Sequence, residues 1–206
     1  MCSDPTHPVN PSLEAWAHGN DARADIEISR DKAELKGGDF LFLISCHQII
    51  DAETRALYRH SLVIHASDLP KGRGWSPMAW EVLEGADRIT VSLLKAEDGV
   101  DSGDIWEKRS FELDGTELLE ELNAKLFDVE LQLMDWALGN CDQTVPEPQI
   151  GDPFTWPRRL PTDSKIDPER PLTESFDTIR IADPDRFPAY FEHRGVRYAI
   201  RLEKLP

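Results

Sequence analysis

The chain of 206 residues is long enough for one ordinary domain with a small appendage, and its 40% hydrophobic content suffices for a buried core. Its 39 acidic residues against 23 basic ones give a formal net charge of -16, which repels a phosphate backbone and argues against a nucleic acid partner. The three cysteines (Cys2, Cys46 and Cys141) are far apart and lack metal-ligand spacing, so we expect neither a disulfide framework nor a metal site.

No stretch of the sequence reaches the ~18 apolar residues of a membrane span, and the first residues lack a basic and then apolar signal pattern. We therefore expect a soluble protein with no membrane partner. The three unpaired cysteines favour a reducing compartment, and the predicted location is the cytoplasm.

The first elements predict a βαβ unit. A continuous apolar run at 40–45 is typical of a central strand covered on both faces, and a second such run spans 61–65. Between them, residues 51–58 favour a helix capped by Asp51. A short helix is expected at 77–83, ending near Gly85.

Strands follow at 88–94 and 104–111, separated by an acidic turn at 97–99. The clearest helix is expected at 116–138, with Gly139 as its stop. Its predicted apolar face consists of Leu118, Leu119, Leu122, Leu126, Val129, Leu133 and Trp136. Strands alternating with helices indicate an α/β fold with a mostly parallel sheet.

Such a sheet usually begins with a strand, but only Met1 and Cys2 precede Ser3-Asp4-Pro5, so the first strand is expected to be short or missing.

After residue 140 the composition changes. Seven prolines between 146 and 171 exclude long helices and favour an ordered, extended wrap. The extension closes with strand-like segments at 189–192 and 196–200 around a turn at 193–195, which predicts a β-hairpin. We thus expect a catalytic domain at 1–140 and a small, proline-rich C-terminal extension at 141–206.

His65 and Asp101 are the predicted chemical centre. His65 ends an apolar strand, which places its imidazole at the carboxyl edge of the sheet, where open α/β folds bind their ligands. Asp101 follows the next predicted strand in the glycine-punctuated turn Asp98-Gly99-Val100-Asp101-Ser102-Gly103. A carboxylate beside an imidazole favours the imidazolium, which can stabilise an oxyanion and relay an amine proton. The pair therefore suits acyl transfer to an amine.

The motifs His65-Ala66-Ser67-Asp68-Leu69-Pro70 with Gly74, and Asp101-Ser102-Gly103-Asp104-Ile105, resemble those of the folate-dependent formyltransferases, which include the methionyl-tRNA enzymes. The resemblance covers roughly 39–138 and implies a Rossmann-like fold, with 10-formyltetrahydrofolate as formyl donor and no metal. It implies His65 and Asp101 as catalytic residues. In the extension, Gln149-Ile150-Gly151, Arg158-Arg159, Asp163-Ser164 and Phe187-Pro188-Ala189 resemble the bacterial enzymes that formylate nucleotide-linked 4-amino sugars.

The same resemblance implies the binding residues. The pterin of the donor is expected against His47, Gln48 and Ile49 and against the turn Glu97, Asp98, Gly99 and Val100. The acceptor is expected to be a small nucleotide-linked amino sugar. Its diphosphate needs local positive charge, and its base or sugar needs a stacking partner. The candidates for binding the acceptor are Ser67, Lys71, Arg73, Trp75, Arg158 and Arg159.

One position departs from the family pattern. The family has an asparagine two residues before the histidine, and this chain has Val63, which offers no side-chain donor. Either His65 and a backbone amide suffice, or another donor such as Asn10 or His47 reaches the site, or activity has been lost. Losing one oxyanion donor costs about 100-fold in rate.

Three functions therefore remain as hypotheses. The first is formyl transfer to an amino-sugar nucleotide, and the second is formylation of methionyl-tRNA, which requires an electropositive surface. The third is a catalytically silent homologue that binds folate or nucleotide. The oligomeric state is open, with a homodimer among the alternatives.

Overall fold

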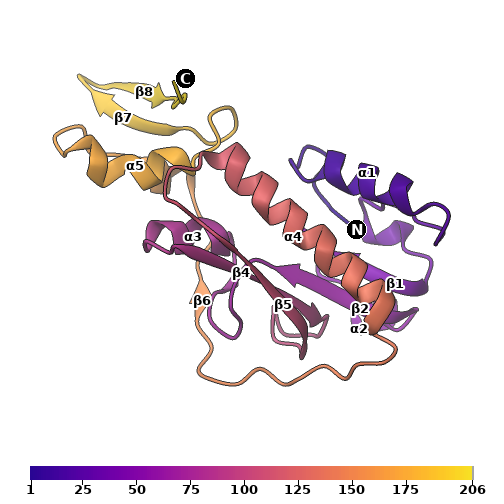
Figure 1. Ribbon diagram of the computed structural model, residues 1–206. Coiled ribbons are helices and arrows are strands. Elements are labelled where there is room, and N and C mark those ends of the chain that lie inside the picture. Colours follow the sequence, from indigo (N-terminus) through magenta and orange to yellow (C-terminus); the bar gives the residue numbers. More distant parts are fainter. Residues whose placement is uncertain (206) are drawn as a thin grey trace.

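A computed structural model describes residues 1–205 (Figure 1). The elements in chain order are α1 (Asn10–Asn20), the 3-10 helix η1 (Lys32–Glu34), β1 (Gly38–Leu43), α2 (Ala52–Arg55), β2 (Tyr58–His65), β3 (Arg73–Gly74), α3 (Pro77–Leu83), β4 (Arg88–Lys95), β5 (Ile105–Glu112), α4 (Leu119–Asn140), β6 (Thr155–Trp156), the 3-10 helix η2 (Pro161–Ser164), α5 (Leu172–Arg180), β7 (Ala189–His193) and β8 (Val196–Ile200). Across these residues no helix combines the length and hydropathy of a membrane span.

The central sheet has the strand order β1-β2-β4-β5. β1 and β2 run parallel with α2 between them, which confirms the predicted βαβ unit. Asp51 caps α2 by accepting a hydrogen bond from the Thr54 backbone N–H at 2.8 Å, as predicted. The helix is shorter than expected because Tyr58 already pairs with Gly38 in the sheet. β4 is antiparallel to both β2 and β5, so the α/β fold is confirmed with a mixed sheet whose parallel pairing is confined to β1 and β2.

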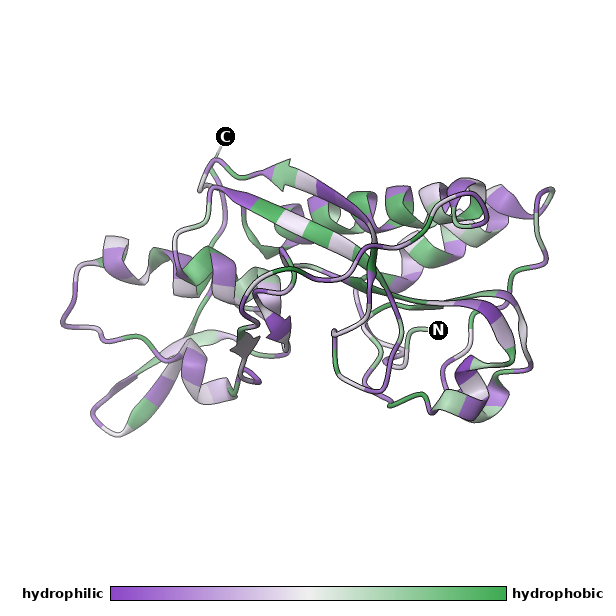
Figure 2. Cartoon of the chain, turned by 90° about the horizontal axis from the view of Figure 1, so that it is seen from below, coloured by the Kyte–Doolittle hydropathy of each residue, from purple (hydrophilic) through white to green (hydrophobic). Residues whose placement is uncertain are grey.

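Helix α4 lies across the sheet and supplies much of the core (Figure 1). Its buried apolar positions pack with strand residues such as Leu62 and Leu93, both fully buried. Green and purple residues mix along the long helix in Figure 2, as in an amphipathic helix that buries one face. The predicted stop at Gly139 is wrong: the helix continues to Asn140, because the Cys141 N–H still donates to the Ala137 carbonyl.

No strand precedes α1 within the described residues. Instead, the backbone of Met1 lies along β1, where its amino group donates to the Phe42 carbonyl at 2.5 Å and its carbonyl accepts from the Ile44 N–H at 3.1 Å. These two hydrogen bonds satisfy backbone groups on the edge of β1 that β2 does not reach. The expectation of a short or missing first strand stays a prediction.

The C-terminal extension leaves the end of α4, crosses beneath the sheet and returns to the opposite end of that helix (Figure 1). On its way β6 pairs in parallel with the short strand β3. The buried Arg180 of α5 anchors it to the segment that precedes α4, since its guanidinium donates to the Glu117 carbonyl at 3.0 Å. The predicted hairpin is confirmed as β7 and β8, paired antiparallel.

Candidate active site

His65 is the last residue of β2, and its side chain is buried. Its Nε2 lies 2.8 Å from the Gly72 carbonyl oxygen. A carbonyl oxygen only accepts hydrogen bonds, so Nε2 carries a proton and donates it. This bond orients the ring and leaves Nδ1 as the nitrogen that can exchange a proton with a ligand.

Asp101 lies beside that free nitrogen. Its Oδ2 is 3.6 Å from His65 Nδ1 and accepts a hydrogen bond from the Gly74 N–H at 2.9 Å. Both side chains are about nine-tenths buried, which strengthens their electrostatic interaction. The 3.6 Å separation is longer than a hydrogen bond, so the two groups interact as a charge pair when His65 is protonated. The structure thus brings together the two residues that the sequence predicted as a pair.

A cavity of about 560 Å³ contains this pair. A volume in this range suits a small-molecule ligand. All the predicted donor-binding residues line it together with His65, Asp101 and Trp75: His47, Gln48, Ile49, Glu97, Asp98, Gly99 and Val100. Two segments far apart in sequence therefore meet at one site: residues 47–49 follow β1 and residues 97–100 follow β4, and these two strands pair with opposite sides of β2.

Arg55 joins the two donor-binding segments. Its guanidinium donates to the Ile50 carbonyl at 2.5 Å and forms an ion pair with Asp98, and its side chain is almost fully buried. Arg55 follows a predicted helix cap and carries no motif, so sequence reasoning missed it. Gln48 lines the cavity, but its amide oxygen already accepts from the Lys32 N–H at 2.9 Å. Its side chain therefore supports the wall of the cavity.

Trp75 lines the cavity, and Arg158 contacts it from outside the lining. Trp75 is 40% exposed, and the Arg158 guanidinium lies over its ring, 4.9 Å from the centroid. The His47 ring centroid is 5.5 Å from that of the same indole. The arrangement offers an aromatic face and a cation at the mouth of the site.

The other predicted acceptor residues do not line the cavity. Ser67 is fully buried and its hydroxyl has no partner, so it is not accessible to a ligand. Arg73 donates to the Gln149 side chain at 2.6 Å, and Lys71 is exposed outside the cavity. Arg159 lies over Trp80, with two of its guanidinium nitrogens buried and unpaired, and burial lowers its pKa. The tertiary packing thus keeps these four out of the cavity lining.

Asn10 and His47, the two side chains suggested as donors in place of the missing asparagine, lie in different places relative to the cavity. Val63 lines the cavity as expected, two residues before His65. Asn10 does not, because its amide is held by the Asp4 carbonyl and by Arg30, so the suggestion that it substitutes is wrong. His47 lines the cavity and is exposed. The structure adds Asn123 of α4, an amide on the cavity wall that sequence reasoning missed.

Glu130 of α4 is a second cavity residue that carried no motif. It is 5% exposed, its Oε2 has no hydrogen-bond partner, and burial raises the pKa of its carboxyl to about 8. The signal was present in the sequence: Glu130 interrupts the apolar stripe between Leu126 and Leu133. A charged residue at a position that helical periodicity assigns to the core is a candidate functional or strained site.

Replacing Glu130 with glutamine is expected to stabilise the protein at neutral pH. The folded state holds the Glu130 proton up to about pH 8, whereas the unfolded chain releases it near pH 4.5. Wild-type stability therefore falls as pH rises between these values, and at pH 7 Glu130→Gln raises the free energy of unfolding by about 3 kcal/mol. Urea unfolding from pH 4 to pH 8.5 measures this.

The exposed Glu120→Gln on the same helix is the control, and its stability should follow the wild-type pH dependence. The explanation is wrong if Glu130→Gln and the wild type keep a constant difference across this range.

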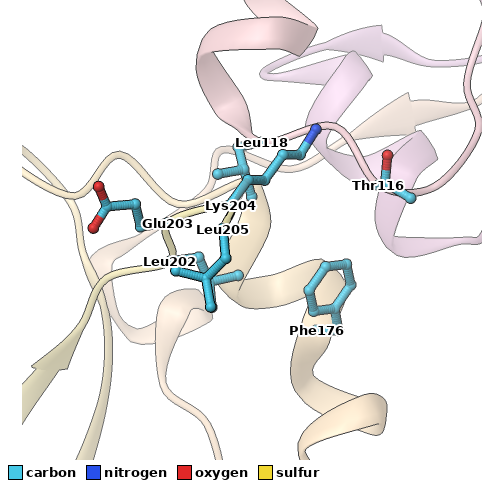
Figure 3. A pocket seen from close by; sticks show the side chains of 7 residues that line it. All are labelled: Thr116, Leu118, Phe176, Leu202, Glu203, Lys204 and Leu205. Atoms are coloured by element: carbon cyan, nitrogen blue, oxygen red, sulfur yellow. The ribbon is translucent and has the colours of Figure 1, made fainter.

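A second, smaller pocket of about 360 Å³ lies where the C-terminal segment meets α4 and α5 (Figure 3). Leu118, Phe176 and Leu202 surround it, while Lys204 forms an ion pair with Glu121. It contains none of the predicted site residues. Its lining residues lie where α5 and residues 202–205 meet the segment that precedes α4.

Comparison with known proteins identifies the family. Residues 5–138 match the formyl transferase family, which covers well over half of the chain and includes both His65 and Asp101. The chain belongs to the formyl transferase family. Formyl-tetrahydrofolate is the formyl donor of these enzymes. The expected Rossmann-like formyltransferase fold is confirmed by solved structures of this family.

Individual relatives point to two acceptor classes. The chain is 36% identical over 99 residues to a methionyl-tRNA formyltransferase of Rickettsia massiliae, a match that covers 48% of this chain but only 33% of that protein. The methionyl-tRNA formyltransferase of Clostridium thermocellum superposes with a TM-score of 0.80 at 25% identity, covering 93% and 87% of the two chains. A sugar N-formyltransferase of Shewanella gives a TM-score of 0.72 at 14% identity, covering 98% and 96%.

Proposed function

We propose that this protein transfers a formyl group from 10-formyltetrahydrofolate to the amine of a nucleotide-linked amino sugar. The observation that carries the proposal is the position of His65 Nδ1 beside the Asp101 carboxylate, in the same cavity as the two predicted donor-binding segments. The chain spans about a third of the length of the curated relatives it matches, so its activity is inferred from this site.

The cavity fits a pterin. Leu94, Ile50 and Val63 supply apolar walls, and the turn at 97–100 brings backbone groups to the same space. A pterin presents a flat ring with an amide-like edge, which an apolar slot with main-chain donors and acceptors can recognise. Arg55 holds the two sides of the slot together. The donor supplies the formyl carbon, and these residues bind and orient it.

His65 and Asp101 then transfer the amine proton of the acceptor. The neutral amine of the acceptor forms a bond to the formyl carbon, and the amine proton passes to His65 Nδ1, the nitrogen that Gly72 leaves free. The Asp101 carboxylate stabilises the resulting imidazolium. Proton return from His65 assists departure of the tetrahydrofolate nitrogen. The negative charge that develops on the formyl oxygen lacks the usual asparagine donor, because Val63 occupies that position.

The choice of acceptor depends on the net charge of the chain and on the contact between Arg158 and Trp75 at the cavity. A formal net charge of -16 opposes a tRNA, whereas a nucleotide diphosphate needs only a local cation. Arg158 over Trp75 supplies that cation beside a stacking surface. The Shewanella sugar N-formyltransferase supports the same choice by its similar fold over nearly the whole chain.

Formylation of methionyl-tRNA is the second candidate. The identity to the Rickettsia enzyme and the TM-score of 0.80 to the Clostridium enzyme favour it. It predicts affinity for tRNA that falls steeply as salt concentration rises. A catalytically silent homologue is the third candidate, and its evidence is Val63.

The deciding experiment incubates the protein with 10-formyltetrahydrofolate and a panel of UDP- and dTDP-linked 4-amino sugars. Mass spectrometry then detects the addition of one formyl group. We expect one or more sugars to be formylated, with initiator methionyl-tRNA unmodified in a parallel reaction. Formylated tRNA without formylated sugar would select the second candidate. Folate binding without any formylated product would select the silent homologue.

A further inference from the structure

Gln149 of the C-terminal extension is bonded to the Asp101 turn and to the β3 loop at once. Its amide nitrogen donates to the carbonyls of Asp101 and Gly103, both at 2.8 Å. Its amide oxygen accepts from the Arg73 guanidinium at 2.6 and 3.2 Å. Both amide protons and the acceptor oxygen are therefore used within the protein.

Apolar burial does not account for the position of this segment. Pro148 and Ile150 on either side of Gln149 are exposed, Ile150 by 88%. Besides the Gln149 amide, a pair of 2.8 Å backbone hydrogen bonds between Glu147 and Ile105 attaches the segment to the sheet. The Gln149 side chain is thus the polar link from the extension to the catalytic turn.

The backbone of the turn that carries Asp101 is strained. Asp101 has a φ of +49°, in the left-handed region that costs a non-glycine residue about 1 kcal/mol. Two residues later, Gly103 packs so closely on the Lys95 carbonyl that no side chain would fit. One amide that binds the carbonyls of both residues holds the backbone in this shape, and the backbone in turn directs the Asp101 carboxylate.

The contacts form a closed ring through the catalytic aspartate. The Asp101 carboxylate accepts from the Gly74 N–H at 2.9 Å, Arg73 precedes Gly74 in β3, and the Arg73 side chain returns to Gln149. Gln149 therefore fixes both the turn that carries Asp101 and the residue next to the amide that holds its carboxylate. Neither contact reaches substrate, so the effect on the reaction passes through Asp101.

We propose that Gln149 is a positioning residue that sets Asp101 against His65, so that the C-terminal extension completes the active site. Arg73 belongs to the same positioning unit and does not bind the acceptor phosphate. The kinetic part of this inference rests on the proposed formyl transfer. Its structural part, the placement of the Asp101 carboxylate, can be measured without turnover.

The test replaces Gln149 with methionine, which keeps its length and removes all four contacts. The Gly74 N–H reports on Asp101 alone, because it donates to the Asp101 carboxylate. The neighbouring Arg73 and Trp75 N–H groups report on the β3 and β6 pairing, because they donate to the carbonyls of Phe154 and Trp156. Hydrogen exchange by NMR in the full chain distinguishes these three amides.

We expect the Gly74 N–H to lose protection in Gln149→Met while the Arg73 and Trp75 amides keep theirs. The kcat for formyl transfer should fall about tenfold or more, with the KM for the donor unchanged within twofold. Gln149→Glu keeps the acceptor for Arg73 but sets a carboxylate against two carbonyls, so it should show the same selective loss. Gln143→Met is the control, since Gln143 is exposed in the same extension.

Two results would overturn the proposal. Equal loss of protection at all three amides would mean that Gln149 only fastens the extension, and an unchanged Gly74 amide in both variants would mean that Asp101 does not depend on it. Selective loss at Gly74 in a protein that formylates no acceptor would support the placement of Asp101 while rejecting the proposed function.

Discussion

Replacing His65 with alanine is expected to lower kcat for formyl transfer by about 10²- to 10⁴-fold, the range of a positioned general acid and base. The imidazole is the group whose free Nδ1 faces Asp101 in the cavity, while its Nε2 is committed to the Gly72 carbonyl. Alanine removes the proton acceptor but leaves the donor-binding segments in place. The measurement is the initial rate of formylated product by mass spectrometry, with the donor varied to obtain KM.

His18→Ala is the matched control for this variant. His18 is an exposed histidine of α1 whose contact with Asp21 lies outside the cavity, so its loss should leave kcat within twofold. A His65→Ala protein that retains more than a tenth of wild-type kcat would exclude the imidazole from proton transfer. A rise in donor KM alone would make His65 a binding residue.

Replacing Val63 with asparagine is expected to raise kcat by about 100-fold, the effect of one oxyanion donor. Val63 lines the cavity two residues before His65 on β2. An amide there can donate to the formyl oxygen as negative charge develops on it. The rate is measured by the same product assay under saturating donor and acceptor, so that kcat is compared directly.

The same change should destabilise the fold. Val63 packs against a cluster that contains Leu41, Leu43, Ile50 and Ala96, and an amide without a partner costs about 1 to 3 kcal/mol there. Val63→Leu is the control, because it offers no donor and should leave kcat at or below the wild-type value. An active wild type whose kcat does not change in Val63→Asn would show that another group serves the oxyanion. An inactive wild type and an active Val63→Asn would establish the silent homologue.

Local patterns predicted the elements that matter most to the site. The apolar run before His65 ends at the sheet edge as expected, and the turn that carries Asp101 follows β4. Alternation and apolar runs specify strands because side chains alternate across a sheet. The direction of β4 was not predictable in this way, since a strand has the same pattern whether its neighbours are parallel or antiparallel.

Short-range motifs were less informative about which charged residues reach the cavity. The sequence predicted that four basic residues bind the acceptor: Lys71, Arg73, Arg158 and Arg159. Of these four, only Arg158 lies over a residue that lines the cavity. Glu130 and Asn123 project from α4 into the cavity, and their exposure to it depends on how that helix crosses the sheet. Gln149 reaches Asp101 only because the extension passes under the domain.

The sequence by itself predicted the α/β fold, the proximity of His65 and Asp101 and the C-terminal hairpin, because each depends on residues close together in the chain or on two motifs of fixed spacing. The two segments of the predicted donor site came from the family resemblance. Tertiary structure alone decided which nitrogen of His65 is free, which cations border the cavity, and that the extension holds the Asp101 turn. These features depend on contacts between residues far apart in sequence, whose geometry is set by packing and by the pairing of buried polar groups.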